Sequence, residues 1–164
     1  MRKLQVMEQE YLNTLSQAFI DKSPGAESAL CIQCGTCSGS CPLAAQMDNS
    51  PRKILALIRD GCLEEALRSK SIWLCVSCNA CLTRCPRGIP VPDIMYRLRV
   101  LALQHQMPVK EHKMPDLYQA FVRQVEKRGR VNEARLAVRY GFSHPRDLPG
   151  HLGLAMKLLK KGRI

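Results

Sequence analysis

The chain has 164 residues, enough for one domain or for a small domain with an extension, and no stretch approaches the ~18 consecutive apolar residues that a transmembrane helix needs. Its net charge of +11 is unevenly divided, because residues 1–96 carry 10 Lys or Arg against 9 Asp or Glu, whereas residues 97–164 carry 15 against 5. Composition therefore excludes a membrane-spanning chain and predicts a soluble protein whose basic C-terminal part is an interaction surface.

Residues 1–22 carry apolar side chains at the spacing of one helical face. The positions are Leu4, Met7, Tyr11, Leu15 and Ala18. The Ser23-Pro24-Gly25 segment then ends the predicted helix, which we interpret as packing for the domain that follows, with contact to a partner protein as the alternative. The N-terminus has no apolar signal-peptide core, so we expect a cytoplasmic protein with reduced thiols.

Two short segments share the cysteine pattern C-x-x-C-x-x-C-x-x-x-C-P. The first run contains Cys31, Cys34, Cys37 and Cys41 before Pro42, and the second contains Cys75, Cys78, Cys81 and Cys85 before Pro86. Two such runs are the ligand pattern of a protein with two cubane 4Fe-4S clusters, in which each run gives three thiolates to one cluster and its fourth to the other. The sequence therefore predicts two 4Fe-4S clusters and a role in electron transfer.

The spacing within each run suits the geometry of a cubane. Its four iron corners lie close together, so three ligands must come from one tight loop, and Gly35 allows the backbone to approach the cluster. The proline that closes each run turns the chain away and directs the fourth thiolate to the neighbouring cluster. The predicted ligands are Cys31, Cys34, Cys37 and Cys85 for cluster 1, and Cys75, Cys78, Cys81 and Cys41 for cluster 2.

Other uses of the cysteines fit the pattern less well. Zinc sites use C-x-x-C pairs separated by a longer stretch, and four cysteines within eleven residues leave no room for one. A disulfide framework would need an oxidising compartment. The ninth cysteine, Cys62, follows Gly61 at a predicted helix junction, where we expect a small buried hydrophobic residue; redox sensing and cluster assembly are the alternatives.

The segments that follow the runs are predicted to be helical. Ser50-Pro51 marks a helix start and Gly61 its end, and a second short helix covers Leu63 to Arg68. Residues 86–92 are too rich in proline for a helix, and residues 93–106 form the next one. The inward positions are Ile54, Leu55, Leu57, Ile58, Leu63, Ala66, Leu67, Ile94, Leu98, Leu101 and Ala102. The two halves align at an offset of 44 residues and strict period-2 alternation is absent, so we predict an all-α fold, with residues 1–106 as an α-helical ferredoxin domain.

Residues 107–164 are predicted to form a helical, basic C-terminal extension that docks the chain on another protein. The apolar stripes are Leu117, Phe121, Val122 and Val125, ended by Gly129; Ala134, Ala137 and Val138, ended by Gly141; and Leu148, Leu152, Ala155 and Leu159, surrounded by Lys157, Lys160, Lys161 and Arg163. These stripes cannot bury much against one another. We therefore expect the extension to wrap the cluster domain or to lie on a neighbouring protein of a complex.

The residues that flank the cysteines carry a resemblance to a known family. They are SPRKI at 50–54, IWLC at 72–75, CPRGIPVPDI at 85–94 and KRGRVNE at 127–133. In this order they resemble the iron-sulfur C subunit of heterodisulfide reductase over nearly the whole chain. The resemblance implies an α-helical ferredoxin domain with two 4Fe-4S clusters. It also implies that the chain relays electrons between two other proteins of a complex, the flavin-bearing A subunit on one side and the catalytic, cysteine-rich B subunit on the other.

Other functions remain open at this point. The same kind of domain occurs in succinate dehydrogenase and glycolate oxidase, so another cytoplasmic or membrane-associated oxidoreductase is an alternative. A stand-alone cluster protein that binds a partner is a weaker one. Nucleic-acid binding is not expected, because the basic tail lacks interleaved aromatic residues for base stacking. The chain also has no P-loop, no G-x-G-x-x-G and no paired carboxylates, so we expect no catalysis by the chain alone.

Overall fold

The computed structural model describes residues 2–22, 24–107 and 113–143, together with Gly153, Met156, Lys157, Lys160 and Lys161. Regular secondary structure in these residues is entirely helical, so the predicted all-α fold is confirmed. The described helices include none that combines the length and the apolar character needed to cross a membrane. The chain divides into two compact units, Met1–His112 and Lys113–Ile164.

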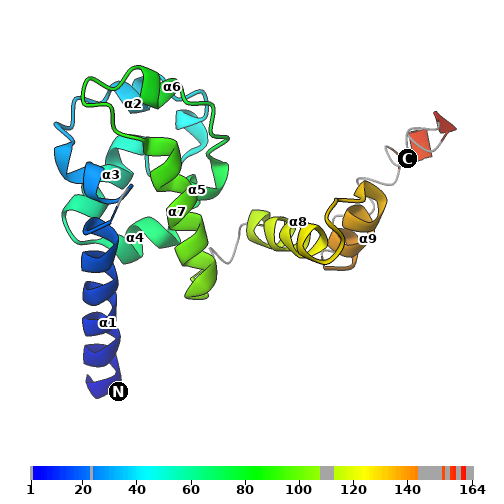
Figure 1. Ribbon diagram of the computed structural model, residues 1–164, viewed down its shortest axis with the longest axis horizontal. Coiled ribbons are helices and arrows are strands. Elements are labelled where there is room, and N and C mark those ends of the chain that lie inside the picture. The colour runs from blue at the N-terminus through cyan, green and yellow to red at the C-terminus, as the bar shows by residue number, and fades with distance from the viewer. Residues whose placement is uncertain are drawn as a thin grey trace. The chain divides into compact units, whose positions relative to one another are not determined.

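The first unit contains helices that alternate with the two cysteine runs (Figure 1). In chain order they are α1 (Arg2–Ile20), the 3-10 helix η1 (Ala26–Leu30), α2 (Thr36–Gly39), the 3-10 helix η2 (Ala44–Gln46), α3 (Pro51–Arg59), α4 (Leu63–Arg68), α5 (Ser71–Leu74), α6 (Ala80–Thr83) and α7 (Val91–Gln104). Helices α2 and α6 contact each other and carry the cysteine runs at one end of the unit, while α3, α4, α5 and α7 pack behind them (Figure 1).

The apolar core lies between α3, α4 and α7. Its fully buried side chains are Ile54, Leu55, Ile58, Leu63, Ala66, Leu67, Ile94, Met95, Leu98 and Ala102, joined by Phe19, Ile72, Ile89 and Val91. The predicted inward residues of these helices are thus buried, except Leu57 and Leu101, which are partly buried against the same core. Each fully buried Leu, Ile or Met side chain contributes about 1.5–3 kcal/mol. Five cysteines of the two runs belong to this core or pack against it, so burial of the core also positions the runs.

Helix ends in the first unit follow the predicted signals with one correction. Helix α3 begins at Pro51 after Ser50, whose side chain makes no capping hydrogen bond, and Gly61 ends it with a φ of 77°. Helix α7 begins at Val91 and ends at Gln104, each two residues earlier than predicted. Pro92 lies in its first turn, where a backbone N–H group would have no acceptor within the helix, so proline costs no hydrogen bond there.

Two predictions about burial in this unit need correction. The buried residues of α1 include Leu12, Ser16 and Phe19, and Leu15 is partly buried against the core as predicted. Ala18 and Tyr11 are exposed, with the Tyr11 hydroxyl 2.5 Å from the Nδ1 atom of His105, and the side chains of Leu4 and Met7 lie outside the described residues. A small polar residue sits in the middle of the buried face, and this is why apolar spacing alone selected a neighbouring face. Cys62 is exposed rather than buried, because the apolar side of the junction is occupied by Leu63.

The second unit contains α8 (Met114–Arg128) and α9 (Glu133–Ser143), which pack against each other. Helix α8 ends at Gly129, as predicted, with a φ of 69°. Helix α9 begins after Asn132, whose Oδ1 atom accepts a hydrogen bond from the Arg135 N–H at 2.9 Å, and it continues past Gly141, where the sequence predicted its end. The predicted third stripe, Leu148, Leu152, Ala155 and Leu159, lies outside the described residues.

Asp48 joins the segment after the first cysteine run to the segment before the second. Its Oδ1 atom accepts hydrogen bonds from the hydroxyls of Ser69 at 2.7 Å and Ser71 at 2.5 Å, and from the N–H groups of Asn49 and Ser71. Its Oδ2 atom accepts one from the Lys70 N–H at 3.1 Å. Burial alone would raise the pKa of this carboxyl, but the hydrogen bonds from Ser69, Ser71 and the backbone outweigh it and hold the pKa well below its usual range.

Asp48→Asn should therefore lower the free energy of unfolding by about 1–3 kcal/mol, because an amide cannot accept this set of donors and brings its own NH2 group toward them. The measurement is urea unfolding of the anaerobic protein followed by circular dichroism. Asp21→Asn, at an exposed carboxyl that accepts a hydrogen bond from Gln17, is the matched control and should change stability little.

The same pair of proteins gives a pH test. The stabilisation by Asp48 is fully present above the unfolded-state pKa of about 4 and is lost as the pH falls through the depressed folded-state pKa. The stability difference between wild type and Asp48→Asn should be constant above about pH 5 and shrink below about pH 4. A difference that does not change with pH would contradict the role of the carboxylate charge.

Candidate metal centres

The two cysteine runs adopt the same backbone conformation. Gln33 and Ser77, each before the second cysteine of its run, have φ values of 57° and 51°. Gly35 and Asn79, each after the second cysteine, have φ values of 82° and 61°. Left-handed residues in a tight loop turn successive N–H groups to one side, and such concavities bind anions, including iron-sulfur clusters. The backbone of each run thus has the conformation of an anion-binding loop.

A short helix follows each loop. Helix α2 begins after Gly35 and contains Cys37, and α6 begins after Asn79 and contains Cys81. The three-residue gap before the fourth cysteine is therefore about one helical turn, which reverses the chain within a few residues. The sequence predicted each run as a loop and missed these helices, because four residues are too few for a periodic apolar pattern.

The first cavity contains cysteines from both runs. It is lined by Cys31, Cys34 and Cys37 of the first run and by Cys85 of the second. Its other lining residues include Arg52 and Leu55 on α3, and Arg87 in the turn after Cys85. The last cysteine of the second run thus lies with the first three cysteines of the other run.

The second cavity has the reciprocal composition. It is lined by Cys75, Cys78 and Cys81 of the second run and by Cys41 of the first. All its other lining residues are apolar, among them Leu43, Met47 and Met95. Val91, at the start of α7, lines both cavities, so the two cavities are neighbours.

Several donors reach the sulfur atoms of the first cavity. The Gln33 side chain donates to Cys31 Sγ at 3.3 Å, the Ile89 N–H donates to Cys85 Sγ at 3.4 Å, and the Thr36 hydroxyl lies 3.3 Å from Cys34 Sγ. The hydrogen bond from Thr36 lowers the pKa of the exposed Cys34 thiol. These donors stabilise negative charge on sulfur.

Burial acts in the opposite direction on the third cysteine of each run. Burial raises the pKa of Cys37, and burial together with the neighbouring Cys75 raises the pKa of Cys81 to about 11. A thiol must lose its proton to bind iron. These two positions therefore favour the neutral thiol until a positively charged iron atom offsets the cost of a buried thiolate.

The arrangement fits iron-sulfur clusters better than single metal ions. Within the described part of the chain, no three His, Cys, Asp or Glu side chains converge on a site for one ion. The sulfur atoms are instead spread around two cavities, as a cubane requires, because each thiolate binds a different iron atom. Loops that form anion-binding concavities also suit a cluster, since a cubane with four thiolates carries a net negative charge.

Comparisons with known proteins agree with this fit. Residues 27–89 match the family model described as the 4Fe-4S dicluster domain. The chain is 31% identical over 109 residues to the iron-sulfur C subunit of the CoB–CoM heterodisulfide reductase of Methanopyrus kandleri, a match covering 66% of this chain and 57% of the relative. It is 39% identical over 94 residues to the C subunit of the ferredoxin:CoB-CoM heterodisulfide reductase of Methanosarcina mazei, covering 56% of each chain.

A further relative is the C2 subunit of the H2/formate:CoB-CoM heterodisulfide,ferredoxin reductase of Methanococcus maripaludis. It is 40% identical over 88 residues, covering 54% of this chain and 47% of the relative. The chain spans about half the length of the curated relatives it matches. The resemblance predicted from the residues around the cysteines is confirmed over this part of the chain, which matches the model of the 4Fe-4S dicluster domain and is similar to the iron-sulfur C subunits of heterodisulfide reductases.

Proposed function

We propose that this chain is the electron-transfer subunit of a heterodisulfide-reductase-like oxidoreductase complex and that it holds two 4Fe-4S clusters. The ligands are Cys31, Cys34, Cys37 and Cys85 in the first cavity, and Cys75, Cys78, Cys81 and Cys41 in the second. The observation that carries the proposal is the exchange of the fourth cysteines between the runs. Each bound cluster would supply one-electron redox chemistry without proton or group transfer.

The chain's own residues suit a relay. Val91 lines both cavities, so the two sites lie close together. Each cavity also has an exposed edge: Cys34 and Cys78 are exposed, and the residues after the first cysteines, Ile32 and Val76, are 61% and 66% exposed. Exposed apolar residues at equivalent positions of the two runs offer each site its own contact surface for a redox partner.

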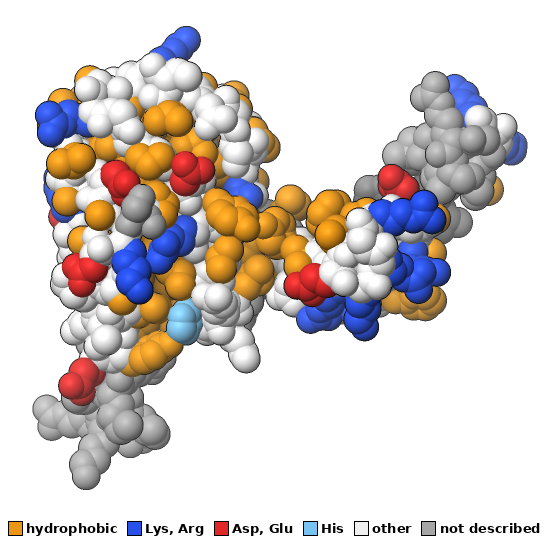
Figure 2. All heavy atoms as spheres, in the orientation of Figure 1, with side chains coloured by type: hydrophobic (Ala, Val, Ile, Leu, Met, Phe, Trp, Pro, Cys, Tyr) orange, Lys and Arg blue, Asp and Glu red, His pale blue; other side chains and the backbone are white. Residues whose placement is uncertain are grey.

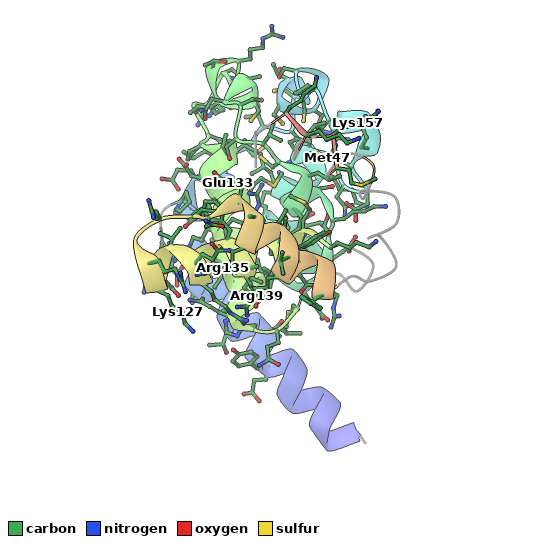
Figure 3. All side chains as sticks on the ribbon, turned by 90° about the vertical axis from the view of Figure 1, so that its right-hand side faces the viewer. Met47, Lys127, Glu133, Arg135, Arg139 and Lys157 are labelled. Carbon is green, nitrogen blue, oxygen red and sulfur yellow. The ribbon has the colours of Figure 1, made fainter. Side chains whose placement is uncertain are left out.

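The second unit supports a docking role. Exposed apolar side chains on α8 and α9 include Phe121, Val138 and Phe142. Figure 2 shows many Lys and Arg side chains over the same helices. Figure 3 labels Lys127 on α8, and Arg135 and Arg139, one turn apart on α9. A basic surface with uncovered apolar residues suits an acidic protein partner.

The partners that we propose are the flavin-containing A subunit of such a complex, together with its catalytic, cysteine-rich B subunit. Both would meet the chain in the cytoplasm, where ligand thiols stay reduced. In this arrangement residues 1–106 hold the clusters and residues 107–164 dock the chain. The names of the relatives describe subunits of heterodisulfide reductase complexes, which supports such an assembly.

Anaerobically prepared protein should contain about eight iron and eight sulfide per chain, because two cubanes with four irons each fill the two cavities. Colorimetric iron and sulfide assays, with zinc measured in parallel, test this. Zinc as the main metal, or half the iron, would rule out the two-cubane proposal.

Cys85→Ser should damage the cluster held by Cys31, Cys34 and Cys37, because Cys85 lines the first cavity. Cys41→Ser should damage the other cluster for the same reason. EPR spectra of the reduced variants, compared with those of Cys34→Ser and Cys78→Ser, identify which signal is altered. Cys62→Ala is the control and should retain both signals, since Cys62 lines neither cavity. Loss of the Cys78-dependent signal in Cys85→Ser would contradict the exchange of ligands.

Charge reversal at Lys157, Lys160 and Lys161, all exposed, should slow association with the catalytic partner protein and weaken its salt dependence, because basic residues steer the encounter with an acidic surface. Stopped-flow association rates at several salt concentrations measure this. The matched control reverses Lys22, Lys53 and Lys70, which are exposed in the first unit. Equal association rates for the two triple variants would contradict docking through the extension.

A further inference from the structure

The two cavities differ in charge although the runs that line them have the same backbone. Arg52 and Arg87 line the first cavity. The second cavity has no charged lining residue among those that the structure describes. Neither arginine forms an ion pair with a carboxylate in the described part of the chain, so their positive charge is not neutralised locally.

The internal repeat shows which residues make this difference. The helices after the runs, α3 and α7, align at an offset of 40 residues, with Leu55 and Met95 lining the respective cavities. At this offset Arg59 corresponds to Arg99. Arg59 donates to the carbonyl of Cys31, and Arg99 donates to the carbonyl of Cys75, so each site has one arginine on the first cysteine of its run. The two differ in their other partners, because Arg59 also forms an ion pair with Asp60 at 3.2 Å, whereas Arg99 also donates to the carbonyl of Ile72.

The other two arginines have no counterpart. At the helix offset of 40, Arg52 corresponds to Pro92, and at the run offset of 44, Arg87 corresponds to Leu43. Pro92 and Leu43 both line the second cavity. The first cavity thus has two cationic side chains at the positions where the second has two apolar ones.

Local contacts place the backbone of both arginines next to the first cavity. The Arg52 N–H donates to the Ser38 hydroxyl at 3.1 Å, which ties the start of α3 to α2, and the Arg52 Cδ atom lies 3.7 Å from the place of a Cβ atom on Gly35. Arg87 follows Cys85 by two residues, in the turn that ends with Gly88 at a φ of 63°. Each arginine is therefore held beside a ligand-bearing loop.

Hydrogen bonds to sulfur add to the same difference. Thr36, whose hydroxyl lies 3.3 Å from Cys34 Sγ, corresponds to Ala80 in the second run, which has no donor side chain. Nearby positive charge and hydrogen bonds to sulfur both stabilise the reduced cluster, which carries one more negative charge than the oxidised one.

We propose that the first cavity is the higher-potential site of the pair and that Arg52 and Arg87 are the positioned charges that raise its potential. This inference rests on the proposed function. A chain that has received one electron from an external low-potential reductant then holds it at the first site. Transfer between the sites oxidises the second by one electron and reduces the first by one, with no bond made or broken.

The test is a potentiometric titration of the anaerobic, cluster-loaded chain, with dithionite as reductant and EPR as readout. Each signal is assigned to its cavity with Cys34→Ser and Cys78→Ser. The higher-potential signal should be the one that Cys34→Ser alters. Arg52→Gln combined with Arg87→Gln should lower the reduction equilibrium constant of that site about tenfold, which is 59 mV for one electron, since both side chains are exposed and partly screened.

Two further variants and one measurement on the wild type test whether the arginine charges cause the shift. Lys53→Gln removes a neighbouring charge that pairs with Glu65 and lines neither cavity, so it should leave both potentials nearly unchanged. Leu43→Arg introduces the missing cation at the second cavity and should raise the lower potential. In wild type, added salt should narrow the gap between the two potentials, a measurement that needs no variant.

The inference is overturned if the higher-potential signal belongs to the second cavity, or if the double arginine variant shifts it no more than Lys53→Gln does. Failure of the proposed function has a different signature. A chain without two cubanes would fail the iron and sulfide assays, whereas two intact clusters with equal or reversed potentials would overturn only the assignment of the higher potential.

Discussion

The fold depends on a single constraint: the last cysteine of each run must reach the cavity formed by the other run. This requires the two runs to lie face to face with fixed register, although more than 30 residues separate them. Contact between α2 and α6 brings the runs together, and Asp48 fixes the segment between them through Ser69, Lys70 and Ser71. The core between α3, α4 and α7 then supports both runs from behind.

Much of this arrangement follows from local sequence signals. The helix start at Pro51, the glycine end at Gly61 and the short helix Leu63–Arg68 could be predicted, because caps, prolines and apolar periodicity act within a few residues. The low aromatic content did not prevent a core, since aliphatic side chains fill it. The kind of cofactor could also be predicted locally, because the spacing of the four cysteines within eleven residues is typical of iron-sulfur clusters.

Other features depend on contacts that no local pattern encodes. The buried face of α1 includes Ser16, and its selection depends on which neighbour the helix meets. Asp48 lies in an unremarkable loop, and its five donors come mostly from a segment more than 20 residues away. No sequence motif distinguishes Arg52 and Arg87 from other surface arginines. Only the folding of both halves around two cavities shows that they line one and not the other.

The left-handed residues of the two loops bear on how the protein matures. Gln33, Ser77 and Asn79 carry side chains in a backbone region that costs of order 1 kcal/mol for such residues, and only Gly35 adopts it freely. A bound iron-sulfur cluster would place negative charge beside the N–H groups of these loops and offset this cost. Because cysteines of both runs line each cavity, a cluster in either cavity would hold residues of both runs. Loading of one cavity would therefore leave less of the chain to be ordered when the other cavity is filled.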